Sequence, residues 1–244
     1  MRVTISQFQQ LFEISESTVD ELDKSLMMLE LITGKTVKDI NKMKQPKLEK
    51  LCNDIRRILN LDIKAQDISD MPETLRIDGE LYHINYDVKN TDAGRYVEVI
   101  TFAKDPIKNL HRIMASVVQR IDDGIVPYDA NIHEAMAEKM LGQDFNLCYK
   151  ISILFAESIK RINDEFEYLW DNKETSSGSI NKEFGRLFGW MYNAKLVSEF
   201  EGIPIANAWR LPVRQFLNDL SYLKMKREAE DEERRRAEIN RPRR

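Results

Sequence analysis

The stretch TLRIDGELYHINYDV, residues 74–88, is the segment of this sequence that predicts a β-hairpin, because helical periodicity dominates on both sides of it. Asp78-Gly79 is a two-residue loop of the kind that accepts a positive φ at both positions. With that loop Leu75 faces Tyr82, and five apolar side chains fall on one side of the ribbon. These are Leu75, Ile77, Tyr82, Ile84 and Tyr86.

An isolated two-stranded ribbon is marginal in water, so the apolar side of this hairpin needs a cover. The candidates are the neighbouring helices or a third strand over Val3 to Ile5. Recruitment of a partner strand along the exposed edge is the alternative. We expect the hairpin to act as a small lid on a helical core.

The other segments predict helices. The spacing of Thr18 and Glu21 is that of a capping box, and the helix that follows ends at Gly34. Apolar residues at intervals of three and four predict the remaining helices. These are a short helix from Thr36, a helix from Pro46 to Leu59, helices over 92–104 and up to Ile121, one from Asn131 to Gly142, and the longest over 144–170.

The predicted fold class is therefore mainly α (α+β), a multi-helix bundle with one small β-hairpin. We expect a helical domain over 1–173, a linker at ETSSGS (174–179), and a C-terminal helical segment over 180–223. Residues 224–244 are charged throughout and predict a disordered tail or a frayed helix. A coiled-coil dimer through the longest helix is the alternative to an intramolecular bundle.

Charge and cysteine content limit the class of protein. Lys+Arg 37 against Asp+Glu 41 gives a net charge of −4, so bulk charge does not indicate a nucleic-acid-binding protein. Cys52 and Cys148 lie far apart in apolar helical patterns, which favours a reducing compartment. The sequence has no signal-peptide core and no window of roughly 20 apolar residues. We therefore expect a cytosolic protein.

No residue pattern specifies a reaction. The sequence contains no glycine-rich phosphate loop, no metal-ligand spacing and no nucleophile elbow. His83, His111 and His133 stand on separate predicted elements. We expect no enzyme, no catalytic residue, no metal site and no cofactor. Arg241, Arg243 and Arg244 are candidates for weak contact with a polyanion, although acidic residues earlier in the tail oppose it.

Partner binding is the remaining expectation. Aromatic residues dominate interface energetics, and the segment 184–217 contains several of them. The candidate anchors are Trp190, Tyr192, Trp209 and Phe216. Packing of the same residues in the core is the alternative.

Four phrases of the sequence resemble a known family. They are LELITGKTVKDINKM, RIDGELYHINYDV, AGRYVEVITFAKDPIKNLHRIMASVVQRID and FGWMYNAKLVSEFEGIPIANAWRLPVRQFLNDLSYLKMK. The chain resembles structural-module proteins of tailed bacteriophages of Bacteroidetes hosts, and its order of elements is similar to that of tail assembly chaperones. The likeness spans roughly residues 1 to 225. The segment after ETSSGS and the charged tail are longer than in compact family members.

The resemblance implies a helical protein in the cytoplasm of the infected host cell. Such a protein binds the long helical tape-measure protein and holds its apolar faces until the tail tube polymerises, with several copies along one client and with homo-oligomers as an option. The runner-up is a structural virion component, such as a connector or ring protein near the portal or tail. Neither reading implies a membrane partner.

Overall fold

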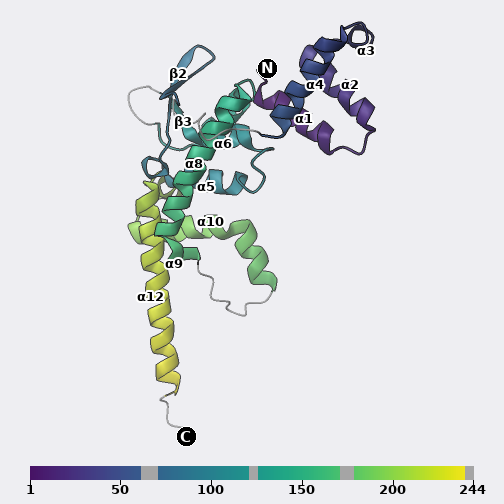
Figure 1. The fold of residues 1–244 in the computed structure, drawn as a ribbon. Helices are drawn as coiled ribbons and strands as arrows, with labels where there is room; N and C mark the ends of the chain where they lie inside the picture. Colours follow the sequence, from purple (N-terminus) through teal and green to yellow (C-terminus); the bar gives the residue numbers. More distant parts are fainter. Residues whose placement is uncertain (62–70, 121–125, 171–178, 240–244) are drawn as a thin grey trace. The chain divides into compact units, whose positions relative to one another are not determined.

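The computed structural model describes residues 1–61, 71–120, 126–170 and 179–239. The chain is mainly helical and carries one small antiparallel sheet, as predicted (Figure 1). It forms two compact units. Unit 1 comprises Met1–Ile84, Val99–Val126 and Ala130–Leu154, and unit 2 comprises Asn85–Glu98, Pro127–Asp129 and Phe155–Arg244.

The hairpin is formed by β1 (Thr74–Ile77) and β2 (Glu80–Ile84), and its predicted register is confirmed. Leu75 pairs with Tyr82, and the loop residues Asp78 and Gly79 have φ values of 50° and 86°. The predicted inward face of the two strands is buried. Its members are Leu75, Ile77, Tyr82 and Ile84. Tyr86 follows the end of β2 and is half-buried.

A third strand pairs with the second edge of β2, at a different place in the sequence from Val3 to Ile5, which was one of the two candidate covers of the hairpin. It is β3 (Val118–Arg120), which pairs with β2 so that Ile84 lies opposite Val118. Val118 continues the apolar spacing of the preceding helix, so periodicity extended that helix through these residues to Ile121. The sheet order is β1-β2-β3.

The segment proposed as the third strand instead begins a helix, α1 (Ile5–Glu16). Thr4 and Gln7 form a capping box, in which the Thr4 hydroxyl accepts from the Gln7 amide at 3.1 Å and the Gln7 side-chain oxygen accepts from the Thr4 amide at 3.0 Å. This reciprocal pair satisfies two amide groups that a helix start leaves without partners. The same segment also contacts a part of unit 1 that is distant in the sequence, because the amide of Phe145 donates to the carbonyl of Val3 at 2.9 Å.

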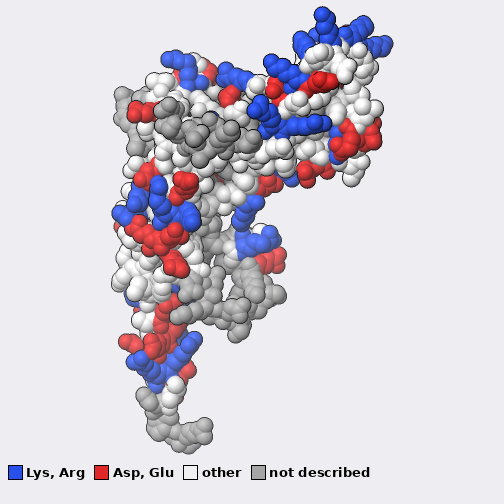
Figure 2. Space-filling model, viewed as in Figure 1, with Lys and Arg blue, Asp and Glu red and all other residues white. Residues whose placement is uncertain are grey.

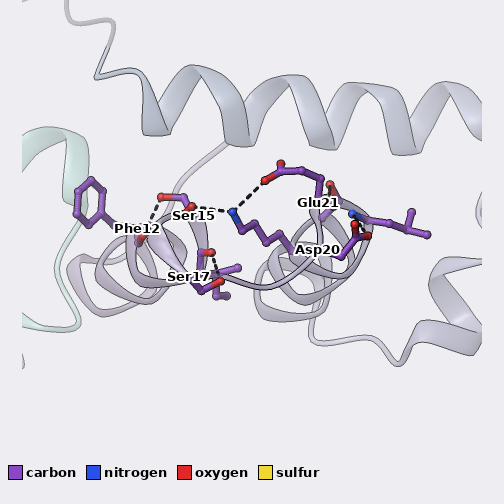
Figure 3. A network of polar contacts seen from close by, with 9 residues as sticks. Phe12, Ser15, Ser17, Asp20 and Glu21 are labelled. Carbon is purple, nitrogen blue, oxygen red and sulfur yellow. Dashed lines mark hydrogen bonds and ion pairs between the residues drawn. The ribbon is translucent and has the colours of Figure 1, made fainter.

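The second helix starts two residues later than the sequence suggests. Asp20 is the N-cap of α2 (Glu21–Thr33), and its carboxylate accepts from the Leu22 amide at 3.0 Å, so the capping box expected at Thr18 is not formed. Figure 3 shows this corner, where Lys24 donates to the carbonyl of Ser15 at 3.2 Å and pairs with Glu21 at 2.9 Å. Gly34, at φ 64°, ends α2 as predicted.

Unit 1 also contains four further helices. They are α3 (Val37–Ile40), α4 (Gln45–Leu59), α6 (Leu110–Val117) and α7 (Ala130–Met140). One buried cluster holds α1 to α4 together, and full burial of each large member is worth roughly 1.5–3 kcal/mol. Its fully buried members are Leu11, Met28, Leu29, Ile40 and Ile55.

Two helices have residues in both units. They are α5 (Ala93–Phe102) and α8 (Phe145–Glu165). The long helix expected over 144–170 is therefore α8 followed by the single turn α9 (Glu167–Trp170). Unit 2 is completed by the short 3-10 helix η2 (Val88–Asn90) and by α10 (Ser179–Glu201), α11 (Ile205–Ala208) and α12 (Val213–Ile239). The described part of the charged tail is thus helical as far as Ile239.

Unit 2 is closed by pairing between the start of α5 and the segment before α12. The amide of Ala93 donates to the carbonyl of Leu211 at 2.9 Å, and the amide of Val213 donates to the carbonyl of Thr91 at 3.0 Å. Asp92, between them, is 8% exposed and forms an ion pair with Arg95. The sequence predicted one contiguous domain up to residue 173. The two observed units are divided differently, because this pairing brings 85–98 into the same unit as the C-terminal helices.

Asp92 is held by several donors. Its carboxylate accepts from the amide groups of Arg95 and Tyr128 at 3.0 Å each. Burial raises the pKa of Asp92, and the guanidinium of Arg95 and the two amides oppose that rise. Gly94 lies against the same tyrosine, since a Cβ at position 94 would come within 2.3 Å of the Tyr128 ring. Only glycine fits at this position.

Candidate interaction surface

Residues 184–192 of α10 present large apolar side chains to solvent. The residues recur at intervals of three and four and form one face of the helix, which we call the α10 stripe. Its members are Phe184, Leu187, Phe188, Met191 and Tyr192, with exposed fractions of 51%, 55%, 52%, 54% and 41%. The stripe spans about 12 Å of helix at the standard rise per residue. Soluble proteins normally bury such a face against another element.

A different face of α10 supplies its packing. Ala194 and Val197 are fully buried. Trp190 is half-buried, and its ring meets the Tyr96 ring edge-on at 6.0 Å and the Trp170 ring at 5.9 Å. At 100° per residue, Trp190 and Val197 lie about a third of a turn or more from the centre of the stripe, and Ala194 lies about a quarter of a turn from it. The helix is therefore anchored in unit 2 without use of the stripe.

The stripe continues into a groove formed by α9, α10 and α12. The groove encloses about 490 Å³, and Tyr192 belongs both to the stripe and to its wall. Its other apolar lining residues are Leu169, Trp170, Leu196, Leu220 and Leu223. A concave apolar surface adjoining an exposed apolar helix face is the geometry that receives an amphipathic helix.

Basic residues of α12 form the polar rim of this groove. Lys224, Lys226 and Arg227 line it together with Glu230, and Lys226 pairs with Glu230 at 3.9 Å. Lys224 has a structural part as well, because its ammonium donates to the carbonyl of Tyr168 at 2.6 Å and lies 4.7 Å from the centre of the Tyr168 ring. The rim is net positive, which favours a partner with carboxylates beside its apolar face.

The four predicted anchors have different environments. Phe216 is fully buried, Trp209 is half-buried and stacks on it with ring centres 6.1 Å apart, and Trp190 packs as described above. Tyr192 is the predicted anchor that lies on the stripe. The structure therefore brings Trp209 and Phe216 together, and neither residue belongs to the stripe. Arg241, Arg243 and Arg244 lie outside the described residues.

The sequence reasoning did not single out Phe184, Leu187, Phe188 and Met191 as surface residues. A signal was present, because these residues have helical spacing. The same spacing is typical of a core-facing helix, and only the structure distinguishes a face that has a cover from one that has none.

Other polar groups have structural partners. In unit 1 the Ser116 hydroxyl and His133 Nε2 are 2.7 Å apart and buried, and the imidazole stacks on Phe102 with ring centres 6.3 Å apart. Burial raises the pKa of the Cys148 thiol to about 12, which removes its reactivity as a thiolate at neutral pH. Among the described residues, no group of three or more His, Cys, Asp or Glu is placed to hold a metal ion.

Across the described ranges, none of the helices combines the length and the apolar character needed to span a membrane. Comparison of the chain with protein-family models, with curated proteins and with solved structures finds no match in any of the three.

Proposed function

We propose that this protein is a non-enzymatic assembly protein that holds the apolar face of a helical client. The observation that carries the proposal is the α10 stripe, in which five large apolar side chains remain exposed on a helix that packs in unit 2 through Trp190, Ala194 and Val197. The resemblance to phage tail assembly chaperones supplies the client class, an extended helical protein such as a tape-measure protein. In this proposal the chaperone acts in the infected host cell.

Energetics support a helical client. The five residues form a row at i, i+3, i+4, i+7 and i+8, which matches the apolar row of an amphipathic helix laid beside it. Burial of apolar surface contributes roughly 25 cal/mol per Å². Each site is small, so tight capture of a long client requires several copies bound along it.

The first test removes the stripe. In the triple variant Phe184→Ser, Leu187→Ser and Phe188→Ser, we expect co-purification with the client to be lost while the melting temperature changes by no more than about 2 °C, because exposed side chains contribute little to stability. The matched control replaces three exposed apolar residues of unit 1, Leu22, Leu81 and Ile132, which are 68%, 43% and 54% exposed. Equal loss of the client in both triple variants would refute a role specific to the stripe.

The second test separates the chaperone from a virion component. Quantitative mass spectrometry of purified particles and of the infected-cell lysate should find peptides from residues 112–161 in the lysate and not in the particles. A fixed copy number in the particles would refute the chaperone and would identify a connector or ring component instead. The stripe would then be assigned to a permanent neighbour.

A further inference from the structure

The exposed surface of residues 35–50, which comprise α3, the residues on either side of it and the start of α4 in unit 1, is strongly basic. Residues 35–50 contain six lysines, and all six are exposed. They are Lys35, Lys38, Lys42, Lys44, Lys47 and Lys50, and we call them the lysine face. Figure 2 shows the blue side chains gathered over the elements that Figure 1 labels α3 and α4. Each of the two acidic residues of the stretch accepts a hydrogen bond from a nearby side chain. Asp39 accepts from the Thr36 hydroxyl at 2.9 Å, and Glu49 accepts from the Gln45 side-chain amide at 2.9 Å.

The lysine face is not explained by the stability of the fold. In the ranges that the structure describes, its six ammonium groups form no ion pair, whereas Lys24 pairs with a carboxylate at 2.9 Å and Lys195 at 3.7 Å. Lys44 is the N-cap of α4, with no side-chain hydrogen bond, and Lys47 follows in the first turn. Positive charge at a helix N-terminus opposes the helix dipole, so these positions lower the stability of α4 slightly.

We propose that the lysine face binds the phosphodiester backbone of a nucleic acid. Lysine ammonium groups on flexible stems act as point charges toward phosphates. Protein interfaces are instead depleted in lysine and enriched in aromatic residues and arginine. Val37, 37% exposed, is the large apolar side chain exposed among residues 35–50, so a membrane would gain little insertion energy here.

The net charge of −4 does not oppose this binding. At physiological salt the screening length is about 8 Å, so a phosphate at the lysine face interacts mainly with the charges near it. Bulk composition averages over the whole chain and therefore hides a local surface of this kind. The inference is independent of the proposed function, because the lysine face is on α3 and α4 of unit 1 and the stripe is on α10 of unit 2.

The test is fluorescence anisotropy with the full chain, a labelled DNA duplex of about 20 bp and a single-stranded RNA of about 20 nucleotides, at salt concentrations from 50 to 200 mM. We expect salt-sensitive binding of at least one probe. In the variant Lys38→Gln, Lys42→Gln and Lys47→Gln, the slope of log affinity against log salt should become shallower by about 2.7 for the duplex or about 2.1 for the single strand, if each lysine contacts a phosphate. The two values identify which nucleic acid is bound through these lysines.

Two further variants keep the test decisive. The control Lys104→Gln, Lys160→Gln and Lys195→Gln removes the same charge from other exposed positions and should retain the affinity within about twofold at 100 mM salt, where the first variant loses at least about tenfold. A Lys→Arg version of the first variant keeps the charge and should bind both probes like the parent, which excludes misfolding as the cause of the loss.

Three results would overturn the proposal. One is no binding of either probe at 50 mM salt. Another is equal loss of affinity in the control variant, which would reduce the effect to net charge. The last is salt-sensitive self-association in sedimentation velocity without nucleic-acid binding. That result would assign the lysine face to a second copy of this chain, whose exposed Glu13, Glu16 and Asp23 on α1 and α2 would be its partners.

Discussion

Replacement of Ile84 by alanine tests how the hairpin is held in unit 1. Ile84 is on β2, the central strand of the sheet, and it is 1% exposed. The change removes three buried carbon groups, worth about 0.8 kcal/mol each, and leaves a cavity that adds about 1 kcal/mol. We therefore expect unit 1 to lose about 3 kcal/mol, which corresponds to a fall in melting temperature of roughly 10 °C for a unit of this size.

Leu81 on the same strand is the matched control. It points to the opposite side of the sheet and is 43% exposed, so Leu81→Ala should cost less than about 1 kcal/mol. Thermal unfolding followed by circular dichroism measures both changes, and hydrogen exchange of peptides covering 74–84 locates the loss in the hairpin. Equal shifts for the two variants would refute the assignment of the inward face, and with it the role of the hairpin as a cover for the helical core.

The remaining predictions concern unit 2 and the thiols. Gly94→Ala should lower the melting temperature of unit 2 markedly, because its Cβ would lie within 2.3 Å of an aromatic ring; an unchanged melting curve would refute the close packing. Iodoacetamide should label Cys52, which is half-buried, long before Cys148, and labelling of both at equal rates in the native protein would contradict the burial of Cys148. Burial and the neighbouring Glu201 raise the pKa of Asp219 to about 6, above its value in the unfolded chain. The protonated carboxyl therefore stabilises the fold below about pH 4, and this stabilisation is lost as the pH rises through 6. Asp219→Asn should raise the free energy of unfolding by about 1 kcal/mol at pH 7.5, a value already reduced for solvent screening, and should leave it unchanged at pH 4. A pH-independent effect of this substitution, measured by thermal unfolding, would count against the raised pKa.

Local patterns predicted the local structure well. The Asp78-Gly79 loop set the hairpin register because a two-residue turn with positive φ leaves one pairing that buries a single face. Gly34 ended α2 for a similarly local reason, a left-handed backbone that glycine adopts without strain. These features depend on residues close together in sequence.

Features that depend on residues distant in the sequence could not be predicted from local patterns. Val3 to Ile5 was one candidate for a third strand, whereas β3 lies at Val118–Arg120. Strand pairing across 34 residues, between Ile84 and Val118, leaves no local pattern. The start of α1 was missed although Thr4 and Gln7 have capping-box spacing, because Val3 to Ile5 was considered as a strand. Helical periodicity located α10 but did not reveal that its apolar row lacks a cover.

For the candidate surfaces too, local sequence patterns predicted some features and missed others. Tyr192 was predicted as an anchor and is exposed on the stripe, whereas Phe216 was predicted from the same rule and is fully buried. Aromatic content alone does not separate these two environments, because it carries no information on which neighbours fold over the ring. The lysine face was hidden by the balance of charge over the whole chain.

The pairing that closes unit 2 has a consequence for synthesis of the protein on the ribosome. The amide of Val213 donates to the carbonyl of Thr91, so this contact forms only after another half of the chain has been translated following Thr91. At typical elongation rates of about 5–20 residues per second, that wait lasts roughly 6–24 seconds. In the later part of that wait, after residues up to Leu154 have emerged, every segment of unit 1 is present, while the first turn of α5 still lacks its partner segment at 211–213. The nascent chain therefore passes through a state in which unit 1 can fold while unit 2 is still open to chaperones and proteases.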